Sequence, residues 1–146
     1  MSGTNPYGVY RQTAVETATP AELVVMLYDG AVRFLLRSEQ AMQEDGPGRA
    51  PGQIARAQSI ILELLATLDL DAGDFAQQLA GLYAYMYRRL GEASIGRDAS
   101  TVRHVRGLLE QLRAAWKEAI SRASQQAGLR AVPASPRPGE LLARAG

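Results

Sequence analysis

The stretch that most constrains the fold is TATPAELVVMLYDGAVRFLL, which covers residues 17–36. Thr19 is followed by Pro20 and, three positions later, by Glu22. This T-x-x-E pattern is a capping box, and proline is favoured at the first helical position because its missing N–H has no helical partner there. The stretch therefore predicts a helix that begins at Pro20, and we expect it to cover residues 20–44.

The predicted first helix carries apolar residues on two lines. One face consists of Leu23, Leu27, Gly30, Ala31, Phe34, Ser38 and Ala41, with Val24, Tyr28 and Leu35 on its flank. A second line, formed by Val25, Val32 and Leu36, lies roughly 140° from the centre of the first at about 100° per residue. Because one apolar face is enough to bury a helix, the sequence predicts more apolar surface than a single core contact requires.

Three further helices are predicted after the first. Residues 45–52 hold two prolines and three glycines and should form a loop. Apolar residues at helical spacing then predict helices over residues 53–70, 75–95 and 99–126. In the third helix we expect Phe75 on the core side and Tyr87 on its edge; in the fourth, Asp98 should be the cap, and Trp116 and Ile120 should belong to a narrow apolar stripe. Short loops force neighbouring helices to run antiparallel. The sequence thus predicts an all-α protein, an antiparallel up-down four-helix bundle that spans residues 19–127.

The segments on either side of this bundle should be less regular. Residues 1–18 are interrupted by glycine and proline, and we expect a short N-terminal arm or helix that carries Tyr7 and Tyr10. Such an arm must dock on its own domain or wait for a partner. Residues 128–146 contain three closely spaced prolines, which predicts a disordered C-terminal tail.

Residues that commonly carry catalysis are scarce. The chain has no cysteine, and its one histidine, His104, should lie at the edge of the polar face of the fourth helix. Neither a phosphate-binding glycine motif nor the Glu-x-x-His pair of a di-metal bundle occurs. Asp69, Asp71 and Asp74 lack the spacing of a calcium loop and fit a helix stop and cap. We expect no catalytic residue, no metal site, no cofactor and no enzyme activity.

The charge and hydropathy patterns argue against two kinds of partner. Sixteen basic and fifteen acidic residues give a net charge of +1 without a run of five like charges, so nucleic-acid binding is not expected. No stretch approaches 18 uninterrupted apolar residues, and the first residues lack a basic region followed by an apolar one. We expect a cytoplasmic protein without membrane insertion.

What remains is apolar surface beyond the needs of one core, which normally marks a partner site. Besides the second line of the first helix, it includes Ile60 and Leu62 on the shoulders of the second helix and Tyr85 on the outer side of the third. The candidate partner-binding residues are Tyr7, Tyr10, Val25, Tyr28, Val32, Leu36, Ile60, Leu62 and Tyr85. The alternatives are that the N-terminal arm covers this surface or that two copies form a homodimer.

Three motifs give the sequence a family resemblance. TATPAELVVMLYDGAVRFL, LYAYMYRRL at residues 82–90 and LLEQLRAAW at residues 108–116 resemble the flagellin export chaperones called FliS in order and spacing. The resemblance covers most of residues 10–120. The Pro/Gly-rich first loop and the long tail depart from the usual pattern of that family.

The resemblance implies a cytosolic bundle that binds the C-terminal region of flagellin, prevents premature polymerisation and delivers it to the flagellar type III export gate. It also implies that the apolar faces of the first two helices take flagellin. The arm from Tyr7 to Tyr10 would contact the export-gate component FlhA. The alternative, from a different class, is a self-associating structural helical bundle with no client.

Overall fold

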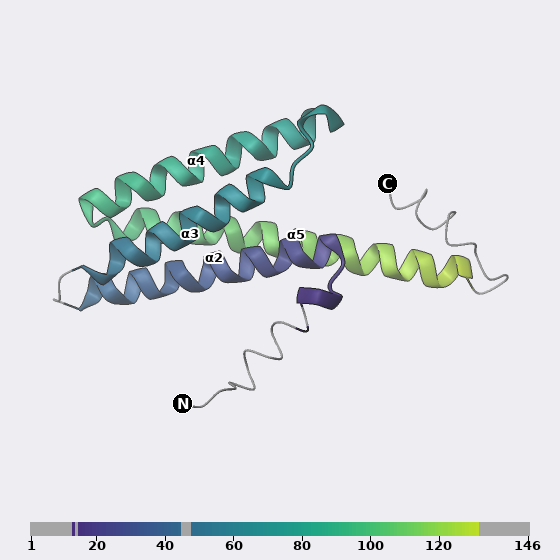
Figure 1. Cartoon of the computed structure of the whole chain (residues 1–146), viewed down its shortest axis with the longest axis horizontal. Helices are drawn as coiled ribbons and strands as arrows, with labels where there is room; N and C mark the ends of the chain where they lie inside the picture. The colour runs from purple at the N-terminus through teal and green to yellow at the C-terminus, as the bar shows by residue number, and fades with distance from the viewer. Residues whose placement is uncertain (1–12, 14, 45–47, 132–146) are drawn as a thin grey trace.

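The computed structural model describes residues 13, 15–44 and 48–131 of the 146-residue chain. Within these ranges the protein is helical throughout and contains no strand (Figure 1). The elements are α2 (Pro20–Gln43), α3 (Arg49–Ala66), the 3₁₀-helix η1 (Leu70–Ala72), α4 (Asp74–Gly96) and α5 (Ala99–Ala131). Helix α2 packs on α3 and α5, and α4 packs on the same two helices from the other side. The predicted all-α bundle is confirmed.

The start of α2 follows the sequence prediction. The Glu22 backbone N–H donates to Thr19 Oγ1 at 3.2 Å, and the Thr19 N–H donates to Glu22 Oε1 at 3.4 Å. Asp98 likewise caps α5, because its Oδ1 accepts from the Thr101 N–H at 3.2 Å. Each cap satisfies an amide that has no partner within its helix. These caps fix where two of the four long helices begin.

Other helix ends differ from the prediction. Helix α3 begins at Arg49, four residues before the predicted start, because Pro51 lies in its first turn, where proline is tolerated. Gly48, with φ at 82°, supplies the left-handed conformation just before it. Helix α4 is preceded by Gly73, not by Asp74 as predicted. Helix α5 continues through Gly128 to Ala131, so it enters the range predicted to be a disordered tail. Residues 132–146 of that tail lie outside the described residues.

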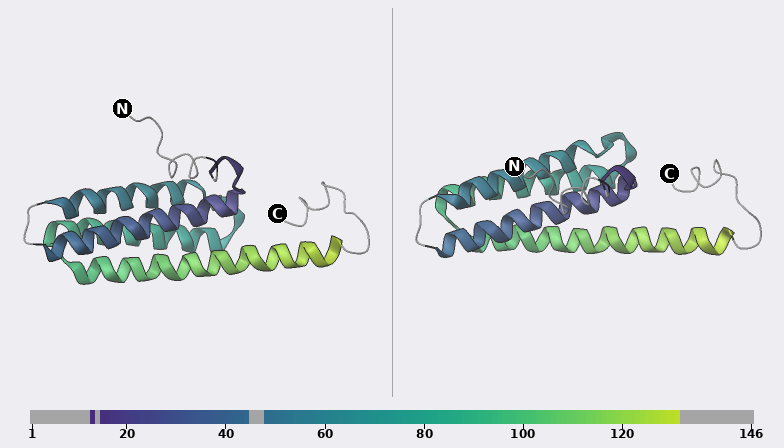
Figure 2. Two further views of the ribbon diagram at one scale, coloured as in Figure 1. Left: turned by 90° about the horizontal axis from the view of Figure 1, so that it is seen from below. Right: turned by 60° about the horizontal axis from the view of Figure 1, so that its bottom comes forward.

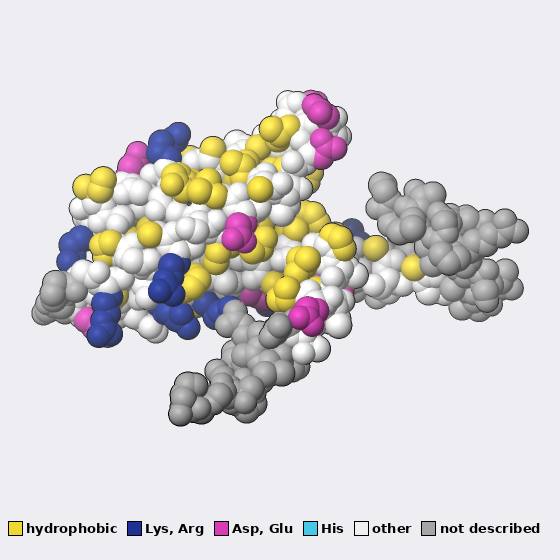
Figure 3. Space-filling view, viewed as in Figure 1, with side chains coloured by type: hydrophobic (Ala, Val, Ile, Leu, Met, Phe, Trp, Pro, Cys, Tyr) yellow, Lys and Arg dark blue, Asp and Glu magenta, His cyan; other side chains and the backbone are white. Residues whose placement is uncertain are grey.

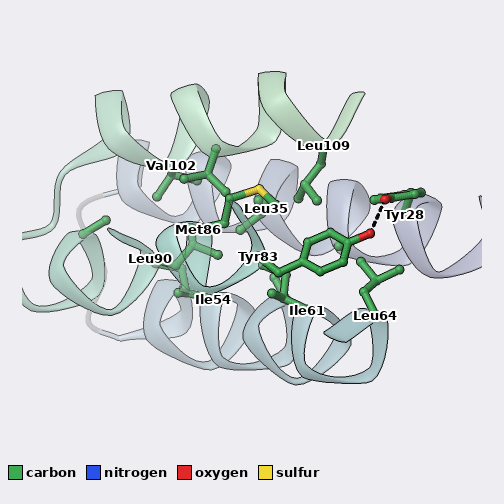
Figure 4. Packing of buried hydrophobic residues seen from close by; sticks show 14 of the residues in the cluster. Tyr28, Leu35, Ile54, Ile61, Leu64, Tyr83, Met86, Leu90, Val102 and Leu109 are labelled. Carbon is green, nitrogen blue, oxygen red and sulfur yellow. Dashed lines mark hydrogen bonds between the residues drawn. The ribbon is translucent and has the colours of Figure 1, made fainter. Parts of the chain in front are cut away.

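The core lies where all four long helices meet (Figure 4). Its largest fully buried side chains are Tyr28, Tyr83, Leu35, Ile54, Ile61, Leu64, Met86, Leu90, Leu109, Val102 and Val105. On α2 the buried line runs through Val24, Tyr28 and Leu35, which the sequence placed on the flank of the core face, and through Ala31. The predicted centre of that face is therefore wrong by roughly one residue.

The displacement has a physical cause, because α2 has two neighbours. On the α3 side, a Cβ built on Gly30 would lie 3.1 Å from Ile60 Cδ1. On the α5 side, Asp29 forms an ion pair with Arg113. A helix that packs between two others buries side chains over a wide arc of its surface. Part of the apparent excess of apolar residues on α2 is thus accounted for by a second neighbouring helix.

The bundle is open at one end. Figures 1 and 2 show that the α3–α4 pair diverges from the α2–α5 pair toward the end that carries η1 and the start of α2. Phe75, in the first turn of α4, is 72% exposed there, although the sequence predicted it in the core. Helix α5 runs on beyond its neighbours, and residues 117–119 and 121–126 are all exposed. The protein therefore presents an open end and a projecting helix side by side.

Candidate functional site

An apolar opening lies at the diverging end of the bundle, and we call it the end cavity. Its volume is about 410 Å³. It is lined by Pro20, Ala21, Leu23, Val24, Leu27, Thr67, Leu68, Tyr83 and Trp116. Volumes of this order are typical of ligand and side-chain pockets. Because all four long helices or their immediate flanks supply the lining, the cavity exists only in the folded bundle.

Three polar groups join two walls of the end cavity to the core. Trp116 Nε1–H donates to the Tyr28 hydroxyl at 3.2 Å, and the Tyr28 and Tyr83 hydroxyls are hydrogen-bonded to each other (Figure 4). Both tyrosines are buried. Their burial removes water from the charged form and raises the pKa of both hydroxyls, mainly through desolvation. Both hydroxyls therefore stay protonated in the folded protein.

This network predicts a loss of stability at high pH. A raised pKa stabilises the folded state below the ordinary tyrosine value of 10.0, and that contribution is lost as the pH rises above it. Each tyrosine kept neutral on folding should lower the free energy of unfolding by about 1.4 kcal/mol per pH unit above that value. Urea unfolding between pH 9 and pH 11 measures the slope. Tyr83→Phe should reduce the slope, whereas Tyr87→Phe, at an exposed tyrosine, should not; equal slopes in both variants would contradict the assignment.

A second apolar opening, the α2/α5 groove, runs along the other side of α2. Its volume is about 350 Å³. It is lined by Glu22, Val25, Met26, Asp29, Lys117, Ile120 and Ser121. A further hollow of about 500 Å³ shares Asp29 and adds Val32, Arg33, Glu110 and Arg113. The start of α2 thus has an apolar opening on each side, with charged residues at the groove's edges.

The structure brings some of the predicted contact residues together on the α5 side of α2. Val25 lines the α2/α5 groove and Val32 lines the adjoining hollow. Leu36, on the same line of α2, is 40% exposed. These three positions can reach a partner without any change in the bundle. Tyr7 and Tyr10 lie outside the described residues.

Other predicted contact residues lie elsewhere. Tyr28 is fully buried in the core. Ile60 packs on Gly30 in the seam between α2 and α3. Leu62 is 48% exposed on α3, away from the α2/α5 groove. Partner contact by these three stays a prediction, and for Tyr28 it would require the bundle to open.

Tyr85 is only half-exposed, because it packs across the α4–α5 seam. Its hydroxyl lies 3.3 Å from His104 Nε2, and the Arg88 guanidinium lies 5.8 Å from the centre of its ring. Tyr87, predicted at the edge of the core side, is 39% exposed. The sequence therefore overstated the exposure of Tyr85 relative to Tyr87.

Sequence reasoning missed several residues of these openings, namely Leu68, Trp116, Lys117 and Ile120. The sequence places Trp116 and Ile120 in the apolar stripe of the fourth helix and predicts that both pack in the bundle. The signal that could have revealed them is length, since α5 has 33 residues and α2 has 24. The surplus end of a longer helix has no neighbour in an antiparallel bundle.

The described residues show neither a cluster of three or more potential metal ligands nor a helix long and apolar enough to cross a membrane. Asp69 instead accepts from the Asp71 N–H at 3.0 Å and caps η1, as the helix-stop interpretation predicts.

Comparisons with known proteins single out one family. The family model described as "Flagellar protein FliS" matches residues 3–123. The flagellar secretion chaperone FliS of Bacillus subtilis is 40% identical over 120 residues, which is 82% of this chain and 90% of the relative. The protein of the same name from Salmonella typhimurium is 39% identical over 129 residues, 86% and 95% of the two chains. That of Escherichia coli is 35% identical over 121 residues, 81% and 89%.

Proposed function

The chain belongs to the FliS family of flagellar proteins, and from this premise we propose that it is a cytoplasmic export chaperone for flagellin. In this proposal it binds the C-terminal region of flagellin, prevents premature polymerisation and delivers it to the flagellar type III secretion gate. No enzyme activity is needed for these steps, since each of them is a binding or a release.

The observation that carries the proposal is the pair of apolar openings along the start of α2. The end cavity lies on its α3 side and the α2/α5 groove on its α5 side. An amphipathic client segment can place apolar side chains in such openings, as in other helix-in-groove complexes. A client apolar stripe held here is not free to pair with other flagellin subunits, which accounts for the block on polymerisation.

The energetics allow capture followed by release. Each apolar side chain buried in the openings contributes about 1.5–3 kcal/mol. Ordering a disordered segment costs roughly 2–5 kcal/mol and limits the net affinity. A client held by a few such contacts is bound firmly in the cytoplasm and can still be given up at the gate.

Titration with a flagellin C-terminal segment, followed by native mass spectrometry, tests the proposal. We expect a complex with one chaperone and one segment. The rival function, a self-associating structural bundle, predicts a different result: a tight homodimer that stays unchanged when the segment is added. Failure of the segment to bind a folded monomer would also refute the proposal.

We further propose that the N-terminal arm serves delivery to the gate component FlhA. Tyr7 and Tyr10 lie outside the described residues, so this assignment rests on the family resemblance alone. Tyr10→Ala should weaken FlhA binding more than flagellin binding, since the resemblance assigns the arm to the gate and the apolar faces of the first two helices to flagellin. Pull-downs with each partner measure both losses, and equal losses would contradict the division of roles.

A further inference from the structure

The α2–α3 seam holds an aromatic ring that two arginines approach. Gly30 faces Ile60 across the seam, so one helical turn further along each antiparallel helix Phe34 faces Arg56. The guanidinium carbons of Arg37 and Arg56 each lie 5.6 Å from the centre of the Phe34 ring. The two cations therefore cannot be further apart than twice that distance. A single half-buried phenylalanine thus has two positively charged guanidinium groups close to it at the surface.

These two arginines belong to a larger basic surface, which we call the arginine face: Arg33, Arg37, Arg49 and Arg56. All four are exposed. Among the described residues none of the four forms an ion pair, whereas Arg89, Arg106, Arg113 and Arg122 all do. Glu63, the acidic residue on α3, lies about two turns from Arg56.

Figure 3 shows the same asymmetry on the surface. Basic side chains gather over the halves of α2 and α3 that lie away from the diverging end, with hydrophobic side chains and a few acidic ones beside them. Acidic side chains also mark the opposite end, where Glu22 lies in the first turn of α2 and Asp69, Asp71 and Asp74 lie in or beside η1. Basic residues are therefore more concentrated on this part of the surface than the net charge of +1 suggests.

We propose that the arginine face docks an acidic segment of another protein. Guanidinium groups pair with carboxylates in bidentate geometry, and like charges without counterions gain most from such a partner. Arg33 and Arg37 are four residues apart, about 6 Å along the axis of α2. Carboxylates four residues apart on a docked helix repeat at the same distance. An apolar side chain of that helix contacts Phe34. Phe34, Arg37 and Arg56 lie outside the linings of the end cavity and the α2/α5 groove, whereas Arg33 also lines the hollow that adjoins the groove.

A protein segment fits this face better than a single-stranded nucleic acid. Nucleic-acid platforms stack successive bases on several exposed aromatic rings. Here one ring serves the face, and it is already contacted by two guanidinium groups. Carboxylates need only the N–H groups of the arginines, and a guanidinium has five such donors.

The test uses the full chain and three probes: a 20-residue helical peptide with Glu at every fourth position and Leu between, the same peptide with Gln for Glu, and a 20-nucleotide single-stranded RNA. Fluorescence anisotropy at low and high salt measures each affinity. We expect the Glu peptide to bind at least tenfold more tightly than the Gln peptide at low salt. Arg37→Gln with Arg56→Gln should abolish that difference.

The matched control is Arg88→Gln with Arg122→Gln, which removes two charges elsewhere, one of them also stacked on a ring. It should leave the preference for Glu intact, and thermal unfolding should show both double variants folded. Equal binding of the two peptides, an equal effect of the control, or tighter binding of the RNA would each overturn the proposal. Self-association that disappears in the Arg37/Arg56 variant would do so too, because the occupant would then be a second copy.

Discussion

Val25→Glu combined with Ile120→Glu is expected to weaken the binding of a flagellin C-terminal segment about 100-fold, which corresponds to about 2.7 kcal/mol. The two residues lie on opposite walls of the α2/α5 groove. The substitutions remove two apolar contacts and place new carboxylates beside Glu22 and Asp29. Isothermal titration measures the loss, and circular dichroism should show unchanged helix content because neither residue belongs to the buried core.

The matched control is Ile95→Glu. Ile95 is 90% exposed near the end of α4, at the opposite end of the bundle from η1. Its substitution should therefore leave the affinity for the flagellin segment unchanged. If the double variant unfolds, Ile120→Glu alone still decides the matter, because residue 120 lies beyond the last α5 side chain packed on the core. Wild-type affinity in a folded Ile120→Glu protein would mean that the groove does not hold the client.

Leu35→Ala is expected to lower the free energy of unfolding by about 2–5 kcal/mol. Leu35 is fully buried among residues from the other long helices, so its truncation removes contacts and leaves a cavity (Figure 4). For a domain of this size such a loss is a large share of the total stability. Urea denaturation followed by circular dichroism measures it.

The neighbouring residue provides the control for this substitution. Leu36 is 40% exposed, and Leu36→Ala should change the stability by less than about 1 kcal/mol. The pair separates the buried line of α2 from the exposed line one residue away. Similar losses at both positions would show that the α5 side of α2 is core in solution. Leu36 could then not belong to the proposed client surface.

Local rules were enough to predict the bundle and some of its boundaries. The Thr19–Glu22 capping box and the Asp98 cap depend on residues a few positions apart, and both form as predicted. Where a local signal had two interpretations, the predicted helix boundary was wrong. Pro51 can end a loop or open a helix, and here it lies in the first turn of α3.

Features that depend on several helices at once could not be predicted from one helical wheel. The two apolar lines of α2 are real, but their roles follow from its position between α3 and α5. Val25 and Val32 line openings between α2 and α5, and their contact with a partner stays a prediction. Tyr28, expected on the flank of the core face, is fully buried, and Phe75 is 72% exposed, because burial at these positions depends on how the helix pairs converge at one end and diverge at the other.

The central claim is that a single folded copy holds its client along the start of α2 and the projecting part of α5. Hydrogen–deuterium exchange with and without a flagellin C-terminal segment tests it most directly. Residues 117–119 and 121–126 are exposed on the projecting part of α5. Amides of residues 117–131 should therefore exchange quickly in the free protein and slow at least tenfold in the complex, together with those of residues 20–32. A complex that forms while both ranges keep their free exchange rates would contradict the account.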